Sequence, residues 1–477
     1  ILCTCLMFGV VARAATPEAT LTFLSTASLA LFVGWTFKPP AGSTTAPQAT
    51  PASRFPFPEP WWQAAAIYAT MGVGVLAKGP VGLVLPTAVI GMYCLLLRLP
   101  PTTTPQSRWT RRLGWLRPWE PRHFLKTCWS MRPITAIASV AIVSGPWYVW
   151  VSYRTSGTWL LGFLGEHNVG RALTPMEGHG GSPLYYVVAI LVGMFPWSVV
   201  AIPAILSIRQ TIRHAGKSDE DAPIYRATVF CLCWALVYVG LFTIARTKLP
   251  SYVVPAYPAL AMLLARYLNQ CQFTATSKDR RWLASGMATL AGVGILIVAG
   301  LAVAERQYLD HGLMLAWLGT IPLAAGATGW AMSRRQQDHW VPRVLLTSAI
   351  LQSVLIFGFA TATVSSRRPE FALLAAIRAD QVPHQVATYR RLEPSWVFYL
   401  GQPIETFQHD EQAAAINHLT RQPNPYLITT REGADAISRV LGGNVRRVAT
   451  VPYFMRDDEV VLLAPALHLA TRIDDTP

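Results

Sequence analysis

Residues 226–258 read RATVFCLCWALVYVGLFTIARTKLPSYVVPAYP, and this stretch decides the fold class. Its first 20 residues are almost entirely apolar, and a helix needs about 20 such residues to cross a hydrocarbon core of about 30 Å. Two cations and three prolines follow, so the run ends in a turn before another apolar run begins near Tyr252. The pattern predicts a transmembrane helix, a charged turn and the start of a second helix.

The same alternation recurs over most of residues 1–365. The chain is 52% hydrophobic and 14% charged, whereas ordinary soluble domains carry about 25% charged residues. We therefore predict a polytopic α-helical membrane domain over residues 1–365, with ten full helices and an N-terminal stub. The expected segments are 1–12 (the stub), 19–36, 61–77, 80–98, 133–151, 184–207, 226–245, 252–268, 282–304, 313–332 and 342–365.

Basic residues gather in alternate loops and so orient the helices. Residues 99–132 hold seven Lys or Arg against one Glu, and the loops 208–226, 269–281 and 333–343 are also basic. Such loops mark the cytoplasmic side of a membrane, so the opposite turns are expected to be extracytoplasmic. Residues 38–60 contain seven prolines, which predicts a flexible cytoplasmic insertion.

The formal net charge of +15 belongs to these loops. It therefore indicates contact with membrane lipids and does not indicate nucleic acid binding. The sequence contains no Walker A motif and no G-x-S-x-G elbow, so nucleotide hydrolysis and serine hydrolase chemistry are not supported.

The first residues lie inside an apolar run, with neither an initiator Met nor the basic segment of a signal peptide. We expect that the sequence is N-terminally truncated and begins within a transmembrane helix.

Residues 366–477 have a different character, which predicts a small extracytoplasmic α/β domain. RRPEFALLAAIRAD is typical of an amphipathic helix, and DEQAAAINHLTRQ and REGADAISRVL also suggest helices. WVFYLG, NPYLITT and EVVLLAP are rich in β-branched and aromatic residues, so each is predicted to be a strand.

Cations occupy the outer turns, where the positive-inside rule disfavours them. In the first turn, Arg13 and Glu18 lie on either side of a helix-breaking proline. In the second, Lys78 occupies a tight turn within LAKGPVGLVLP. Each residue could simply extend to the membrane interface. The functional interpretation is a carboxylate that orients an acceptor or a metal, beside an ammonium that binds phosphate.

The other two outer turns combine several polar groups. Glu166 and His167 are candidate metal ligands, and Arg171 on the same helical face is a candidate phosphate ligand. Their spacing matches no defined zinc motif, so a divalent metal is left open. Arg246 and Lys248, with Tyr252 close by, suit a phosphate head group. Four such turns together favour an anion site over interfacial charges alone.

The segments AKGPVGLVLP, HNVGR…EGHGGSPLYY and RTKLPSYVVPAYPAL, in this order, resemble the bacterial aminoarabinose transferase and protein O-mannosyltransferase group of the GT-C superfamily. The resemblance implies a multi-pass enzyme of the bacterial cytoplasmic membrane, with its active face and C-terminal domain in the periplasm. It implies a polyprenyl-phosphate sugar as donor and a lipid such as lipid A, a protein or a glycan as acceptor.

The resemblance also assigns roles to residues. Lys78, Arg171, Arg246 and Lys248 would contact the donor phosphate, and Glu18 would be a catalytic acid of the site. The family's principal catalytic acid lies in the first outer loop, upstream of residue 1, so the chain as printed is expected to lack its general base and to be inactive. The rival function is a flippase for a lipid-linked sugar, which would also need outward cations.

Overall fold

The computed structural model describes residues 1–37, 57–97, 114–170, 181–214, 222–274, 276–308, 314–366, 368–379, 384–453 and 457–466. Two compact units make up the chain. Unit 1 contains Ile1–Leu301 and Ala316–Ile356, and unit 2 contains Ala302–Leu315 and Phe357–Pro477. Most of the predicted Pro-rich insertion lies outside the described residues.

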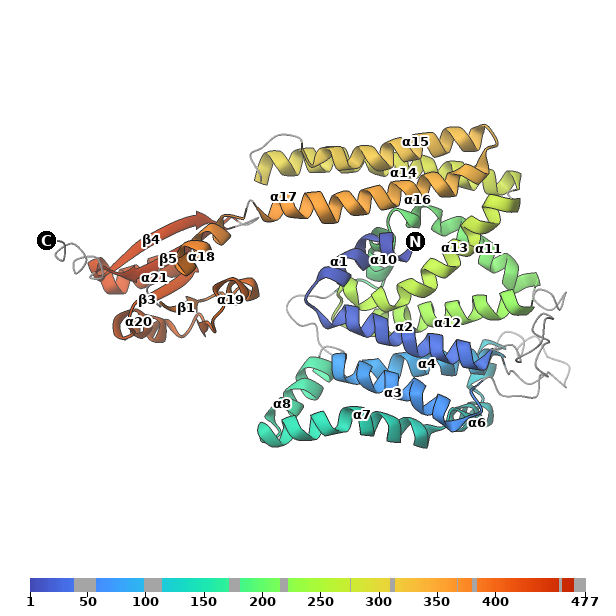
Figure 1. Ribbon diagram of the computed structural model, residues 1–477, viewed down its shortest axis with the longest axis horizontal. Helices are drawn as coiled ribbons and strands as arrows, with labels where there is room; N and C mark the ends of the chain where they lie inside the picture. The colour runs from blue at the N-terminus through green and yellow to red at the C-terminus, as the bar shows by residue number, and fades with distance from the viewer. Residues whose placement is uncertain are drawn as a thin grey trace. The chain divides into compact units, whose positions relative to one another are not determined.

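Unit 1 is a bundle of helices (Figure 1). Its first half contains α1 (Leu6–Arg13), α2 (Pro17–Thr36), α3 (Trp61–Lys78), α4 (Val81–Leu97), α6 (Pro121–Ser130), α7 (Pro133–Arg154), α8 (Thr158–Leu161) and the π-helix η3 (Gly162–Gly170). Its second half contains α10 (Tyr185–Gly193), α11 (Ala201–His214), α12 (Ala222–Ile244), the 3-10 helix η6 (Pro250–Ala256), α13 (Tyr257–Thr274), α14 (Ser277–Tyr308), α15 (Thr320–Arg334) and α16 (Val341–Val354).

Within the described residues each predicted apolar segment is largely helical, but not every one is a straight span. Within the described residues, five helices are long and apolar enough to cross a membrane, and a sixth span results if one bent pair is counted. That pair is Tyr185–Gly193 and Trp197–His214, which meet at 113°. The single helix predicted over 184–207 is therefore wrong, because the chain turns sharply between Gly193 and Trp197.

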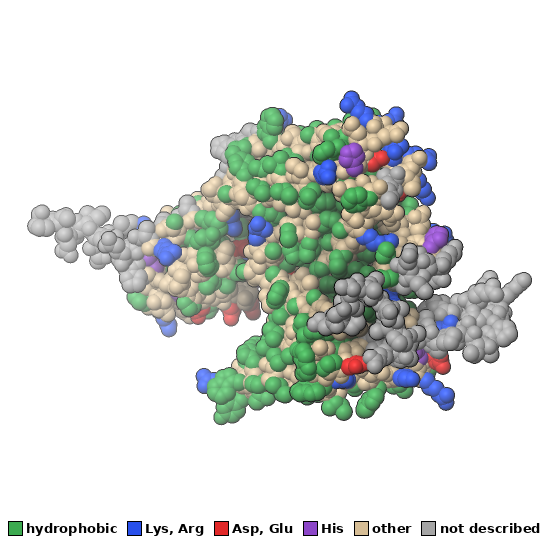
Figure 2. Space-filling view, turned by 45° about the vertical axis from the view of Figure 1, so that its right-hand side comes forward, with side chains coloured by type: hydrophobic (Ala, Val, Ile, Leu, Met, Phe, Trp, Pro, Cys, Tyr) green, Lys and Arg blue, Asp and Glu red, His purple; other side chains and the backbone are tan. Residues whose placement is uncertain are grey.

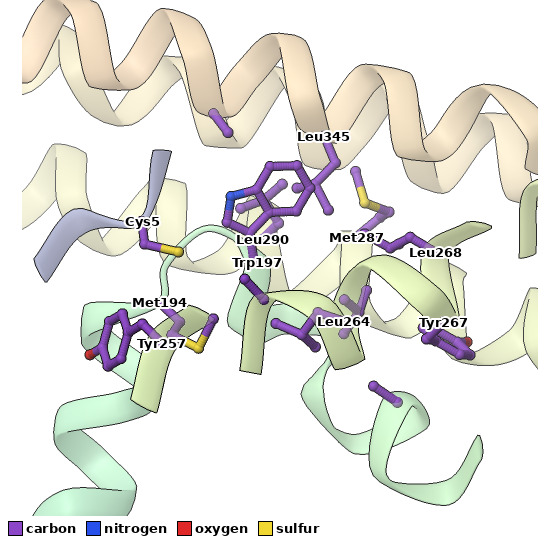
Figure 3. Close-up of a cluster of buried hydrophobic side chains, with 14 of the residues drawn as sticks. Cys5, Met194, Trp197, Tyr257, Leu264, Tyr267, Leu268, Met287, Leu290 and Leu345 are labelled. Carbon is purple, nitrogen blue, oxygen red and sulfur yellow. The ribbon is translucent and has the colours of Figure 1, made fainter. Parts of the chain in front are cut away.

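A buried apolar cluster joins the start of the chain to the second half of unit 1. Figure 3 shows the Trp197 ring packed among Leu290 of α14 and Leu345 of α16. The indole Nε1 of Trp197 donates to Thr4 Oγ1 at 2.9 Å. This indole therefore has the polar partner that a buried Trp requires, and the bend before α11 is held by packing on both sides.

Unit 2 contains a five-stranded sheet in the order β2-β1-β3-β5-β4. The strands β2, β1 and β3 are parallel to one another. The strand β5 is antiparallel to both of its neighbours, β3 and β4. The predicted α/β character is confirmed. The elements are α17 (Thr361–Ser365), α18 (Pro369–Ala379), β1 (Gln385–Tyr389), α19 (Pro394–Leu400), β2 (Glu405–Phe407), α20 (Gln412–Arg421), β3 (Pro425–Thr430), α21 (Arg431–Leu441), β4 (Val445–Pro452) and β5 (Glu459–Pro465).

One predicted strand of unit 2 is a helix. The segment WVFYLG lies in α19, which begins at Pro394 and is closed by Gly401 in the left-handed region. Proline suits the first helical turn and glycine suits the residue after the last. Trp396 is buried against the sheet, whereas Phe398 is 80% exposed. These flanking residues outweigh the β propensity of the aromatic residues between them.

Candidate functional site

An ion pair joins two of the predicted site residues. The ammonium of Lys78 lies 2.7 Å from Glu18 Oε1, and the two side chains are only 20% and 10% exposed. Glu18 is in the first turn of α2 and Lys78 is the last residue of α3. The structure thus brings together two outer turns that lie 60 residues apart in the sequence.

The turn after α3 places Lys78 in this position. Gly79 adopts a φ of 76°, a conformation that glycine reaches without steric cost. Next, α3 and α4 pack so closely that a Cβ on Gly82 would lie 2.3 Å from the backbone of Gly74. Gly79 in the turn and Gly82 in the helix contact therefore allow a tight helical hairpin. The hairpin places the Lys78 ammonium beside the start of α2.

The segment after α12 completes the cluster. Ser251 Oγ lies 3.4 Å from Glu18 Oε1, at the long end of hydrogen bonding. The ammonium of Lys78 lies 4.7 Å from the centre of the Tyr252 ring, within range of a cation–π contact. Glu18, Lys78, Ser251 and Tyr252 will be called the Glu18–Lys78 cluster. Ser251 was not among the predicted site residues, and its position next to Tyr252 was the available signal.

Lys248 has a different environment from the one predicted. Its side chain is buried, and its ammonium donates to the carbonyls of Thr243 at 2.9 Å and Ala245 at 3.0 Å. Thr243 lies in the last turn of α12 and Ala245 directly follows the helix. Carbonyls at a helix end have no partner within the helix. The ammonium also lies 5.6 Å from the centre of the Tyr186 ring. In its described contacts, Lys248 therefore caps the C-terminal end of α12. That Lys248 binds a phosphate stays a prediction.

The remaining predicted cations are solvent-exposed or outside the described residues. Arg246 is exposed, and it has no ion pair within the part of the chain that the structure describes. Arg13 is exposed too, and its guanidinium donates to Gly9 O at 3.2 Å. Arg171 lies outside the described residues. The roles of Arg13, Arg171 and Arg246 in binding a phosphate stay predictions.

The predicted metal ligands cannot be placed relative to one another. Glu166 and His167 lie in η3, but their side chains are outside the described set. Among the residues that are described, no three His, Cys, Asp or Glu side chains come together in a way that could hold a metal ion. A metal at this loop therefore stays a prediction.

Chemically, the Glu18–Lys78 cluster provides an ammonium of fixed position at one end of a helical bundle. The carboxylate of Glu18 orients the ammonium, and the partial exposure of Lys78 leaves part of it accessible. An ammonium in such a position can stabilise a phosphate or another anion that approaches from the membrane interface.

Two curated relatives carry the same name. The undecaprenyl phosphate-alpha-4-amino-4-deoxy-L-arabinose arabinosyl transferase of Enterobacter sp. (strain 638) is 25% identical over 323 residues, which cover 65% of this chain and 52% of the relative. The protein of that name from Aeromonas salmonicida (strain A449) is 26% identical over 310 residues, covering 63% and 48%. This chain is homologous to these arabinosyl transferases. It spans about half the length of either relative.

The solved structures that resemble the chain belong to the same kind of protein. ArnT from Cupriavidus metallidurans bound to undecaprenyl phosphate has a TM-score of 0.67 and 21% sequence identity, covering 97% of this chain and 77% of that one. The apo structure of the same protein has a TM-score of 0.63. The predicted fold class, a polytopic α-helical membrane protein with a small C-terminal α/β region, is confirmed. No family model matches the chain.

Proposed function

We propose that the protein is an integral-membrane glycosyltransferase that moves a sugar from a polyprenyl-phosphate donor to a lipid acceptor. The observation that carries the proposal is the Lys78 ammonium, held by Glu18 at the end of the bundle. The relatives are named for an aminoarabinose carried on undecaprenyl phosphate, so that compound is the first donor to test. Lipid A is the first acceptor to test, with protein and glycan acceptors as alternatives.

In the proposed reaction, an acceptor hydroxyl oxygen attacks the anomeric carbon as the bond from that carbon to the phosphate oxygen breaks. The electron pair leaves with the polyprenyl phosphate, and the hydroxyl proton passes to a general base. Lys78 stabilises the charge that develops on the leaving phosphate, because a preorganised cation acts without reorganisation during the reaction. A single displacement inverts the configuration of the sugar.

We assign Glu18 to positioning. Its Oε1 already accepts from the Lys78 ammonium, so its main effect is to fix that ammonium. Arg246 is exposed at the turn that precedes Ser251 and Tyr252, and it is a second candidate ligand of the donor phosphate. No residue of the Glu18–Lys78 cluster is assigned as the general base in this proposal.

We further propose that the Glu18–Lys78 cluster faces the periplasm and that the α/β domain over 366–477 lies on the same side. The support is the excess of Lys and Arg in the loops at the opposite helix ends. Figure 2 shows apolar side chains over the helices and basic side chains gathered toward one end. The location would be the bacterial cytoplasmic membrane.

The test uses protein expressed from its complete gene and reconstituted in proteoliposomes. A labelled undecaprenyl-phosphate aminoarabinose is supplied with lipid A, and transfer is compared for wild type, Lys78→Ala, Arg246→Ala and Arg213→Ala. The last variant is the matched control, because Arg213 is an exposed arginine at the end of α11. Transfer by wild type and the control, reduced in the other two, supports the proposal.

The same assay separates the transferase from the rival flippase. If labelled donor crosses the bilayer without any change in covalent structure, the flippase is favoured and the transferase proposal fails. A product with retained configuration at the anomeric carbon would exclude the single displacement while leaving glycosyl transfer itself in place.

A further inference from the structure

A second half-buried cation of the bundle lies near the start of α12, whereas the Glu18–Lys78 cluster lies beyond the end of that helix. Arg266 of α13 donates through Nη2 to Thr211 Oγ1 at 2.6 Å and through Nη1 to Thr228 Oγ1 at 3.3 Å. Thr211 belongs to α11 and Thr228 to α12, so the guanidinium joins three helices. One turn away, Ser207 of α11 donates to Gln270 of α13 at 3.1 Å, which continues the polar contact.

Both partners of Arg266 are neutral hydroxyls. Among the described residues, no carboxylate lies within ion-pair distance of this guanidinium. By contrast, Arg280 at the start of α14 lies 2.8 Å from the carboxylate of Asp338. A guanidinium remains charged in proteins and offers five N–H donors, so two hydroxyls leave Arg266 with spare donors and a full charge. Ionisable groups in membrane segments are usually paired, and an anion could accept from the spare donors of this guanidinium.

The location of Arg266 suits a partner from the membrane itself. Thr211 is three residues from the end of α11 and Thr228 is six residues from the start of α12, which corresponds to depths of about 5–9 Å. The headgroup region of a bilayer has a thickness of about 5–8 Å on each side. The guanidinium therefore lies near the boundary between the lipid phosphates and the hydrocarbon.

The surface around Arg266 is apolar and exposed. Met262 and Phe273 lie on the same helical stripe of α13 as Arg266, since they are four residues before it and seven after it. Their exposed fractions are 47% and 73%, and Arg266 itself is half-buried. The stripe therefore places a cation between two exposed apolar side chains. In a phospholipid, the phosphate would contact the cation and the acyl chains would contact the apolar side chains.

We propose that Arg266, Thr211 and Thr228 form a binding site for the phosphodiester of a membrane phospholipid. A guanidinium can contact two phosphate oxygens at once, and the threonine hydroxyls hold it in a fixed orientation. The site lies near the start of α12, whereas Lys248 and the Glu18–Lys78 cluster lie beyond the other end of that 23-residue helix. It therefore serves the opposite leaflet and is separate from the proposed donor site.

The experiment measures the affinity of the full protein for a phospholipid after delipidation in a maltoside detergent. Native mass spectrometry and thermal unfolding are recorded with phosphatidylglycerol, with diacylglycerol and with inorganic phosphate. Wild type is compared with Arg266→Gln, Thr211→Val and the exposed control Arg213→Gln. We expect phosphatidylglycerol to bind wild type and the control, and to bind Arg266→Gln about tenfold more weakly, because a charge-assisted bond is lost. Thr211→Val should show a smaller loss.

Three results would overturn the proposal. Equal binding of diacylglycerol shows that acyl chains alone are recognised. An equal effect of inorganic phosphate shows a site for free phosphate and not for a lipid. Unchanged phosphatidylglycerol binding in Arg266→Gln shows that another group holds the lipid. If Arg266→Gln does not fold, Arg266→Lys replaces it, because a point charge should bind the phosphodiester more weakly than the planar fork while keeping the cation.

Discussion

The two ends of the helical bundle each contain a partly buried cation, and the groups that hold the cation differ between them. At one end, Lys78 is held by the carboxylate of Glu18 at 2.7 Å. At the other, Arg266 is held by the hydroxyls of Thr211 and Thr228. A carboxylate neutralises the cation and fixes its position, whereas hydroxyls only orient it. The chain therefore supplies a counter-ion for Lys78, whereas the described partners of Arg266 leave its charge without one.

The largest expected effect is on catalysis at the Lys78 end. Lys78→Met keeps the length of the side chain and removes its charge, and the rate of sugar transfer should fall about 100-fold, as when one oxyanion-stabilising donor is removed. Steady-state kinetics in proteoliposomes give kcat and KM. A loss confined to KM would show that Lys78 binds the donor without stabilising the leaving phosphate, and Lys78→Arg should recover part of kcat.

The next effect tests the hairpin that positions Lys78. A Cβ at Gly82 would lie 2.3 Å from the backbone of Gly74, so Gly82→Ala should force α3 and α4 apart and cost about 1–3 kcal/mol of folding free energy. Thermal unfolding in detergent measures the change. Gly34→Ala in α2 is the control, because nothing lies within 4 Å of its Cβ position. Equal unfolding temperatures for both variants would contradict the tight packing.

A smaller effect tests the ion pair itself. Glu18→Gln keeps the shape of the side chain but leaves the Lys78 ammonium opposite a neutral amide. We expect a loss of about 1–2 kcal/mol, below the cost of breaking a fully buried pair because both side chains are partly exposed. Ser251→Ala, which removes only a 3.4 Å contact, should change stability less. The interpretation fails if Ser251→Ala is the more destabilising of the two.

The smallest expected effect is on the acid stability of unit 2, where a third cation forms an ion pair. The Arg390 guanidinium lies 2.8 Å from the Glu432 carboxylate in unit 2 and lowers the pKa of Glu432 below its usual range. A lowered carboxyl pKa stabilises the fold above the ordinary value of about 4.3. That stabilisation is lost as the pH falls through the lowered pKa.

Arg390→Gln should therefore remove this stabilisation and shift the acid transition of unit 2 slightly to higher pH. The effect is small because Glu432 is exposed and its ion pair is screened by solvent. Fluorescence of the buried Trp396, followed as the pH is lowered, measures the transition. Arg421→Gln, at an exposed arginine of α20, is the matched control and should behave as wild type. Identical acid transitions in all three proteins would show that the pair has no effect on stability.

Several local features were predictable because their signals are local. Apolar runs of about 20 residues indicated the helices, and Gly79 with Pro80 indicated the turn that carries Lys78. The bend between α10 and α11 was missed because the length of the apolar run over residues 184–207 was weighed above Gly193 and Pro196 within it. Apolar length alone does not distinguish a straight span from a broken one. The helix α19 was missed because β propensity was weighed above its flanking proline and glycine.

The candidate site also combines features that were predictable from the sequence with others that were not. That cations occupy turns at one end of the helices can be seen in the residues alone, since charge and hydropathy are properties of single residues. Which cation contacts which partner depends on the folded chain: Lys78 contacts Glu18 across 60 residues, and Ser251 contacts Glu18 across 233. The folded chain also determines that Lys248 caps α12 and that, among the described residues, the side-chain partners of Arg266 are the hydroxyls of Thr211 and Thr228. Such pairings depend on how helices pack, and no local pattern encodes the distance between two side chains.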